Sequence, residues 1–321
     1  MATDVLTSVA QNPSRNPPGK SGGAGMSRKR KRELILVWAF LLPSLAVFFL
    51  YRVLPLLWNA VLSFQDFSLF GETKWAGISH YQDMMEDEVF WTSLWNTLIY
   101  MASAPVGIVL ALAISLMVNS NVRGKNIYRT IVFLSYPLMT VAVGIIWRWM
   151  LDEKVGLFNF ILRSLHIIDH PLPFLQSFEL ALPSVLLANV WQILGFYMII
   201  LLAGLQNIPQ NLYEAAAIDG ANGRQQFFRI TLPLLRPSIF LAFVIGIMTS
   251  FTSFDLVYVM TQGGPGNSSE LLVTYIYKAA FVLGKIDYAA ALTLVQFVLL
   301  VVLTWVGNRL SGGDAGAVET D

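Results

Sequence analysis

Six long runs of apolar residues, each nearly free of charge, constrain the fold of this chain more than any other feature. They lie at residues 34–57, 94–118, 130–150, 180–205, 237–260 and 288–308. A helix needs about 20 apolar residues to cross roughly 30 Å of hydrocarbon, and backbone groups in lipid must be hydrogen-bonded internally. The runs are continuously apolar rather than alternating, which argues against a barrel of strands. The sequence therefore predicts an all-α integral membrane protein, with six transmembrane helices within residues 34–310.

Composition narrows the possible functions. Hydrophobic residues make up 55% of the chain and charged residues 13%, about half the charged share of a soluble domain. The chain has no cysteine, and its three histidines, His80, His166 and His170, show no metal-ligand spacing. No carboxylate pair and no Ser/His/Asp arrangement stands out. We therefore expect no catalytic residue and no metal site, and we do not interpret the chain as an enzyme.

The distribution of Lys and Arg predicts the orientation of the helices. With the N-terminus inside, the inner segments hold 14 of these residues and the outer segments hold 7. Because cytoplasmic loops carry the excess of Lys and Arg, we expect a multi-pass membrane protein with both termini in the cytoplasm. Residues 1–33 are expected to form a basic, disordered cytoplasmic tail, and residues 311–321 a second disordered tail.

The cytoplasmic loop between the fourth and fifth helices, residues 206–236, has an unusual pattern. Asn211 is expected to cap a short helix, with Glu214 as its reciprocal partner. Three alanines favour that helix, and Gly220 permits a turn after it. An apolar face follows, and Pro233 ends the second helix. The pattern indicates a short helix–turn–helix; the alternative is an amphipathic loop lying on the membrane surface.

This loop resembles the EAA loop of permeases from binding-protein-dependent ABC importers. The matching residues are Glu214, Ala215, Ala216, Asp219, Gly220, Ala221, Phe228, Ile230, Leu232, Pro233 and Pro237. A second segment, Thr261–Glu270, contains Gly263, Gly264 and Pro265 and resembles the outer loop of the carbohydrate-type branch, which is maltose and glycerol-3-phosphate permease-like. The resemblance covers about residues 34–309 and implies that the chain lies in a bacterial or archaeal cytoplasmic (inner) membrane.

The resemblance implies partners. A second, homologous permease would supply the other half of the pathway, two ATP-binding subunits would drive it, and an extracytoplasmic solute-binding protein would deliver the solute. The EAA loop would lie in a groove of the ATPase and couple it to the permease, with Glu214 meeting a basic group there. The loop around Gly263, Gly264 and Pro265 would face the binding protein. ATP and Mg would be held by the partner subunits, so this chain would need no cofactor. The net charge of +1 gives no reason to expect nucleic acid.

Polar and aromatic residues within two of the spans are candidates for the solute pathway. Amides and hydroxyls suit the hydroxyl groups of a sugar, and aromatic rings cover its C–H surfaces. Asn189 and Gln192 are three residues apart, which places them on one helical face. Asp255 is notable because a carboxylate within a span is costly. The alternative is that such residues only bond helix to helix. The candidates are Asn189, Trp191, Gln192, Phe196, Tyr197, Thr249, Thr252, Ser253 and Asp255.

Together these features predict a permease subunit of an ATP-driven ABC importer for a sugar or sugar-like solute. Import of glycerol 3-phosphate or a polyol by the same architecture is one alternative, but an anionic solute would want buried cations, and no span carries one well inside. A proton- or sodium-coupled secondary carrier is the other. Such carriers tend to show internal repeats, and none is evident here.

Overall fold

The computed structural model describes residues 28–67, 72–119 and 124–310. The described part is mostly helical, and the chain divides into two compact units, residues 1–57 and 58–321. Residues 1–27, most of the predicted N-terminal tail, and residues 311–321, the predicted C-terminal tail, lie outside the described residues.

The first unit is a single helical rod in its described part. It comprises α1 (Arg28–Phe48), the π-helical turn η1 (Phe49–Val53) and the start of α2 (Leu54–Leu62). Its large apolar side chains are exposed, Phe40 to 83%. Because exposing this much apolar surface to water is unfavourable, the helix is suited to lipid or to another protein.

The second unit contains the remaining elements. In chain order they are β1 (Gln65–Asp66), β2 (Lys74–Trp75), α3 (Ser79–Glu86), α4 (Glu88–Tyr100), α5 (Ser103–Asn119), α6 (Lys125–Phe133), α7 (Thr140–Met150), α8 (Leu157–Ser164), α9 (Ala181–Gln206), α10 (Gln210–Ile218), α11 (Gly223–Gln226), η2 (Phe227–Thr231), α12 (Leu232–Leu234), α13 (Arg236–Phe251), α14 (Asp255–Met260), α15 (Leu272–Tyr277), η3 (Lys278–Val282) and α16 (Ile286–Leu310). The two strands pair antiparallel.

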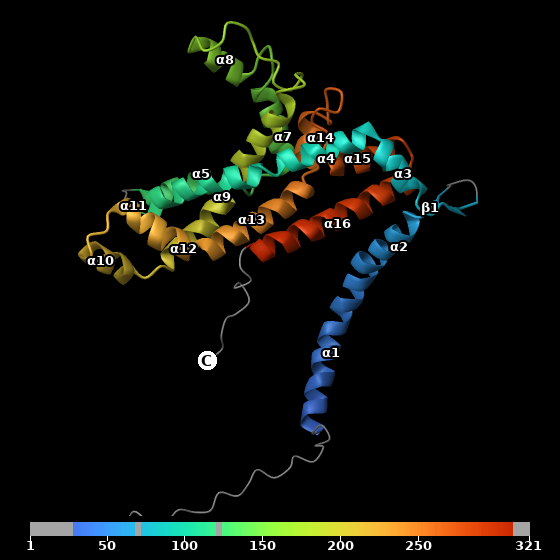
Figure 1. Ribbon diagram of the computed structural model, residues 1–321, viewed down its shortest axis with the longest axis horizontal. Coiled ribbons are helices and arrows are strands. Elements are labelled where there is room, and N and C mark those ends of the chain that lie inside the picture. Colours follow the sequence, from blue (N-terminus) through green and yellow to red (C-terminus); the bar gives the residue numbers. More distant parts are fainter. Residues whose placement is uncertain (1–27, 68–71, 120–123, 311–321) are drawn as a thin grey trace, which may run out of the picture. The chain divides into compact units, whose positions relative to one another are not determined.

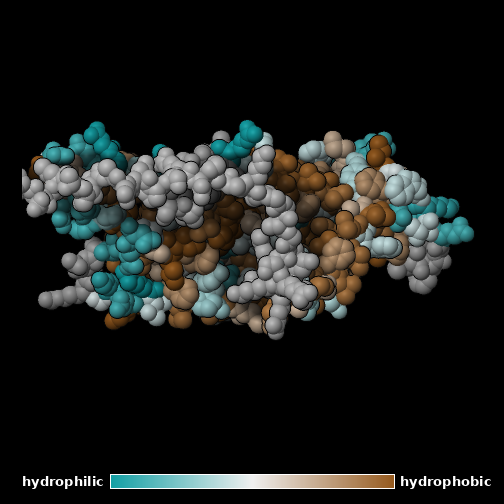
Figure 2. Space-filling model, turned by 90° about the horizontal axis from the view of Figure 1, so that it is seen from below, coloured by the Kyte–Doolittle hydropathy of each residue, from teal (hydrophilic) through white to brown (hydrophobic). Residues whose placement is uncertain are grey.

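The long helices of the second unit pack side by side. Helices α5, α9, α13 and α16 run alongside one another, with α10–α12 at one end and α3 at the other (Figure 1). Hydrophilic side chains gather at the end that carries α10 and at the end that carries β1, with apolar side chains between them (Figure 2). An apolar band between two polar ends is typical of a protein that crosses a bilayer.

Four helical stretches in the described residues are long and apolar enough to cross a membrane: Leu36–Leu62, Glu88–Asn119, Ala181–Gln206 and Ile286–Gly307. A fifth is present if the pair Gly223–Leu234 and Arg236–Phe251, bent by 61°, is taken as one span. The prediction of a helical, multi-pass membrane protein is thus confirmed, with four spans, or five with the bent pair, among the described residues.

The third predicted span is not one continuous helix. Within residues 130–150, α6 ends at Phe133 and α7 begins only at Thr140, and α7 alone is too short to cross. Pro137 lies between them; proline lacks the N–H that a helix needs and restricts the residue before it. The fifth predicted span, residues 237–260, is also interrupted, between Phe251 and Asp255.

Candidate functional site

A polar cavity of about 330 Å³ opens beside the break between α13 and α14. It is lined by Tyr136, Leu138, Thr140, Asn189, Gln192, Ile193, Thr249, Thr252, Ser253, Phe254 and Asp255. Six of the nine predicted pathway residues therefore lie together: Asn189, Gln192, Thr249, Thr252, Ser253 and Asp255. We call this cavity the polar pocket.

The other three predicted pathway residues do not line the polar pocket. Trp191 packs edge-on against Trp147 at 6.0 Å between ring centroids. Tyr197 is 1% exposed and belongs to the core formed with α5. Phe196 stacks at 4.7 Å on Tyr136, which does line the pocket. Phe196 therefore contacts a residue of the pocket wall, Tyr197 is part of the core, and Trp191 is exposed beside α7.

The two amides of α9 play different structural roles. Gln192 is 9% exposed and donates from Nε2 to the Leu138 carbonyl and to Thr140 Oγ1, both at 3.2 Å. It therefore holds the non-helical connection between α6 and α7 against α9. Asn189 is half-buried, and its side chain makes no hydrogen bond within the part of the chain that the structure describes. Its amide remains available to another partner.

The lining of the polar pocket is almost entirely uncharged. Among the described residues that line it, Asp255 is the one charged side chain, and it is exposed at the first position of α14. The other polar groups are hydroxyls and amides. Such a lining suits a neutral, hydroxyl-rich molecule better than an anion, which needs a cationic partner. Sequence reasoning missed Tyr136 and Thr140 because they follow the break after α6, where a continuous helix was expected.

The segment 206–236, which we call the EAA-like segment, forms α10, α11, η2 and α12. Gly220 has φ of +79° and makes the turn between α10 and α11, a conformation that strains other residues. The predicted N-cap is wrong: α10 begins at Gln210 after Pro209, so Asn211 lies inside the helix. The capping box is instead at α11, where Asn222 and Gln225 bond each other's backbone N–H. The signal was there in the sequence, since Asn222 also has an amide residue three positions later.

The EAA-like segment presents most of its matching residues at the surface. Glu214, Ala215, Asp219, Gly220 and Phe228 are exposed, and Ala216, Ala221 and Pro233 are half-buried. A hollow of about 350 Å³ lies between α10 and η2, bordered by Asp219, Gly220 and Arg229. Tyr213 and Thr231 share a hydrogen bond of 2.9 Å that ties α10 to η2. An apolar side chain, Ile218, is 88% exposed. The segment is thus an ordered, exposed surface with a hollow and apolar side chains.

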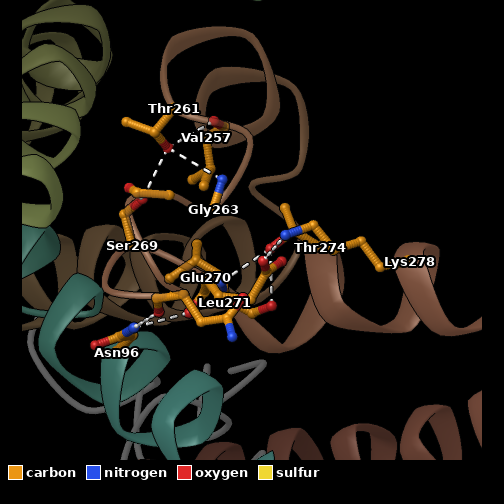
Figure 3. Close-up of polar contacts among 11 residues, drawn as sticks. Asn96, Val257, Thr261, Gly263, Ser269, Glu270, Leu271, Thr274 and Lys278 are labelled. Atoms are coloured by element: carbon orange, nitrogen blue, oxygen red, sulfur yellow. Dashed lines mark hydrogen bonds and ion pairs between the residues drawn. The ribbon is translucent and has the colours of Figure 1, made fainter. Parts of the chain in front are cut away.

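The glycine-rich loop, Thr261–Glu270, is tied to α4 and to α15 (Figure 3). Asn96 of α4 donates from its side-chain amide to the carbonyls of Asn267, at 3.2 Å, and Glu270, at 3.0 Å. Within the loop, Ser269 Oγ donates to Thr261 Oγ1 at 2.8 Å and to the Gly264 carbonyl at 2.6 Å. The loop is therefore preformed rather than a loose connection.

A buried ion pair closes the base of the glycine-rich loop. The Glu270 side chain is fully buried, and its Oε2 pairs with Nζ of Lys278, whose side chain is 30% exposed. Glu270 Oε1 has no partner among the described residues. Gly263 lies close beside this carboxylate, at φ of +81°. Gly264 and Pro265 are half-buried at the tip of the loop.

Asp87 joins three helices at the end of the unit that carries α3. It caps α4 by accepting from Val89 N–H at 2.9 Å, and it accepts hydrogen bonds from the hydroxyls of Tyr275 and Tyr288, the latter at 2.6 Å. Burial raises the pKa of the Asp87 carboxyl, but the hydrogen bonds from Tyr275, Tyr288 and the α4 backbone outweigh it and lower the pKa below its usual value. Burial and the bond to Asp87 raise the pKa of the Tyr275 phenol, which therefore keeps its proton.

Comparison with known proteins agrees with this architecture. The family described as "Binding-protein-dependent transport system inner membrane component" matches residues 103–312. The trehalose/maltose transport system permease protein MalF of Thermococcus litoralis is 32% identical over 280 residues, covering 87% of this chain and 94% of the relative. The sulfoquinovosyl glycerol transport system permease protein SmoG of Agrobacterium fabrum is 32% identical over 281 residues, covering 87% and 91%.

A solved structure shows the same fold. A chain of a bacterial alginate ABC transporter, determined in complex with an alginate pentasaccharide-bound periplasmic protein, superimposes with a TM-score of 0.77 at 26% identity. The match covers 90% of this chain and 98% of that chain. With the family match over residues 103–312, these likenesses show that the chain belongs to the permease family of ABC transporters, the inner membrane components of binding-protein-dependent transport systems.

Proposed function

We propose that this chain is a membrane-spanning permease subunit of an ATP-driven importer for a sugar or sugar-like solute. The observation that carries the proposal is the polar pocket, which gathers hydroxyls and amides from three elements and has Asp255 as the one charge among its described lining residues. Hydroxyl and amide groups match the hydrogen-bonding needs of a neutral polyol surface. The names of the two relatives, a trehalose/maltose and a sulfoquinovosyl glycerol permease, agree with this solute class.

In this proposal six spans cross the inner membrane, with both termini in the cytoplasm. The polar pocket lies on the solute path, and the EAA-like segment faces a cytoplasmic ATPase that holds ATP and Mg. The glycine-rich loop lies outside, where an extracytoplasmic binding protein delivers the solute, and a second permease completes the path. Support comes from the ordered, exposed surface of the EAA-like segment, the preformed glycine-rich loop, and the periplasmic protein bound in the alginate transporter.

The proposal is tested by purifying the tagged chain in a gentle detergent and identifying the proteins that accompany it by mass spectrometry. Recovery of an ATP-binding subunit and a second permease, followed by ATP-dependent uptake of maltose or trehalose into liposomes containing the complex and its binding protein, supports an importer. sn-Glycerol 3-phosphate in the same assay tests the anionic alternative. Recovery of the chain alone, with transport that needs no ATP, would overturn the proposal in favour of a secondary carrier.

A further inference from the structure

The break in the fifth predicted span contains no residue that demands it. Helix α13 ends at Phe251, and α14 begins at Asp255. Thr252, Ser253 and Phe254 between them include neither proline nor glycine. All three line the polar pocket. Thr249, Ser250 and Thr252 bond carbonyls of α13 through their hydroxyls, which weakens the end of this helix, and contacts from other helices then act on the break.

Gln296 of α16 bonds the last carbonyl of α13. Its Nε2 donates to the Phe251 carbonyl at 2.9 Å. In an uninterrupted helix this carbonyl would accept from the backbone N–H four residues later. A carbonyl left without a partner away from water costs free energy. The side chain of Gln296 thus replaces the backbone partner that the break takes away.

Tyr100 of α4 holds the middle of the break. Its hydroxyl shares a hydrogen bond of 2.9 Å with Ser253 Oγ, and its ring is fully buried. Tyr100 is the last residue of α4, and α5 begins at Ser103. Because the ring is fully buried, its hydroxyl has little freedom to move, and the hydrogen bond between them holds Ser253 in place.

These two contacts come from different helices and reach the same three-residue break. Neither Tyr100 nor Gln296 lines the polar pocket, so neither is in a position to bind solute. Gln296 acts on Phe251, the last residue of α13, and Tyr100 acts on Ser253, in the middle of the break. The shape of the break decides where Ser253 and Asp255 stand in the pocket.

We propose that Tyr100 and Gln296 are positioning residues that fix the α13–α14 break in one conformation and thereby set the geometry of the polar pocket. The role of this geometry in solute recognition rests on the proposed function; the effect of the two residues on the break does not. When either contact is lost, the break relaxes and the pocket side of residues 252–255 becomes more accessible.

The chain has no cysteine, so a single reporter cysteine gives a readout that needs neither solute nor ATP. Thr252→Cys places a thiol in the exposed part of the break. In the complex as purified, its modification rate is measured with a small water-soluble methanethiosulfonate reagent and followed on this chain by mass. Adding Tyr100→Phe, or separately Gln296→Met, is expected to raise the rate about threefold or more, the scale set by losing one hydrogen bond.

Two control variants, one on α5 and one on α16, each remove a hydroxyl that has no hydrogen bond to residues 251–254. Ser103 Oγ lies 3.5 Å from Ser250 Oγ and bridges α5 and α13 one residue before α13 ends, and Thr293 of α16 bonds only the Ala289 carbonyl of its own helix. Ser103→Ala and Thr293→Val are expected to leave the labelling rate at that of the reporter alone. Equal labelling in all variants would overturn the proposal. So would a rise of the same size in the controls, which would mean general loosening.

A second measurement separates positioning from general stability. In ATP-dependent uptake of maltose or trehalose, Tyr100→Phe is expected to raise the half-saturation concentration about threefold to tenfold with the maximal rate retained. In a Ser253→Ala background it should add nothing, because the shared bond is already absent. An equal, additive loss of maximal rate would contradict positioning. If the complex takes up no sugar, the proposed function fails, and the labelling result still decides the inference about the break.

Discussion

The backbone of Gly263 lies directly against the carboxylate of Glu270. A Cβ on residue 263 would overlap Glu270 Oε2 and lie 3.0 Å from Oε1. The carboxylate cannot move away, because it is fully buried and paired with Lys278. The left-handed backbone at residue 263 adds a second reason for glycine at this position.

Replacing Gly263 by alanine is therefore expected to destabilise the glycine-rich loop through both backbone strain and overlap. Gly284→Ala is the matched control: Gly284 also has a positive φ, of +69°, but nothing lies within 4 Å of its Cβ position. The control should cost about 1–2 kcal/mol, and Gly263→Ala clearly more. Thermal unfolding of the two variants in detergent measures the difference. Equal midpoints would show that Glu270 adjusts without cost.

Lys278→Met should leave the Glu270 carboxylate buried and unpaired. Removing one partner of a buried ion pair costs about 3–5 kcal/mol, so we expect a large fall in the thermal midpoint. Glu270→Gln combined with Lys278→Met removes both charges and should recover part of the loss. Lys285→Met, at an exposed lysine nearby, is expected to have little effect. A double variant no more stable than Lys278→Met alone would contradict the ion-pair explanation.

Asp87 should make stability depend on pH in acid. Its pKa is lower in the folded chain than the usual value, so the unfolded chain binds the proton more readily. The stabilisation is fully present above the unfolded pKa of about 3.9 and is lost as the pH falls through the folded pKa. Asp87→Asn lacks this stabilisation and should have a lower thermal midpoint than the parent chain at neutral pH. The difference between the two midpoints should narrow below about pH 4.

The measurement is the thermal midpoint of both chains across the acid range. Asp83→Asn is the control, because Asp83 is exposed and makes no hydrogen bond within the described residues; it should follow the parent chain. A constant gap between parent and Asp87→Asn at all pH values would mean that Asp87 does not act through its charge.

Gly220→Val is expected to abolish solute uptake while the chain still inserts and assembles. Gly220 needs a positive φ of +79°, whereas Gly223, in the same segment, does not, and neither has a neighbour within 4 Å of its Cβ position. Gly223→Val therefore adds the same side chain without the backbone strain and should keep most activity.

Glu214→Ala should also abolish uptake, through a lost contact with the ATPase. ATP-dependent uptake is compared with the amount of chain in the membrane; normal uptake by Gly220→Val and Glu214→Ala would remove the coupling role.

Asn189→Ala and Gln192→Ala are expected to weaken or redirect transport in different ways. Asn189 has a free amide toward the polar pocket, so its loss should raise the half-saturation concentration alone. Gln192 also holds the α6–α7 connection, so its loss should lower stability as well. Leu187→Ala, at an exposed position of the same helix, is the control. If both pocket variants keep the parental preference among maltose, trehalose and glycerol 3-phosphate, the pocket is not the solute path.

Sequence periodicity and hydropathy predicted the helical membrane fold but not where its helices are interrupted. The gap after Phe133 could have been found, because Pro137 stands within it. The break at Thr252–Phe254 could not, because neither proline nor glycine stands within it or beside it. Its partners, Tyr100 and Gln296, are distant in sequence and only the fold brings them there.

Helical spacing predicted part of the candidate pocket. Asn189 and Gln192 share a face of α9 and do line the same cavity. Tyr197 could not be separated from them by spacing alone, because its place is set by close packing against Gly107 of α5. Tyr136 and Thr140 were missed because their position depends on the non-helical connection before α7.

The bend of 61° before Arg236 has a mechanical consequence. Through this bend the EAA-like segment continues directly into α13, and the break lies at the other end of α13. A movement of the EAA-like segment is therefore transmitted along α13 to the break. Helix α13 has 16 residues and is about 24 Å long. If the short arm at α12 is pushed so that α13 tilts by about 10°, simple trigonometry on that length moves Phe251 by about 4 Å, more than the width of a water molecule.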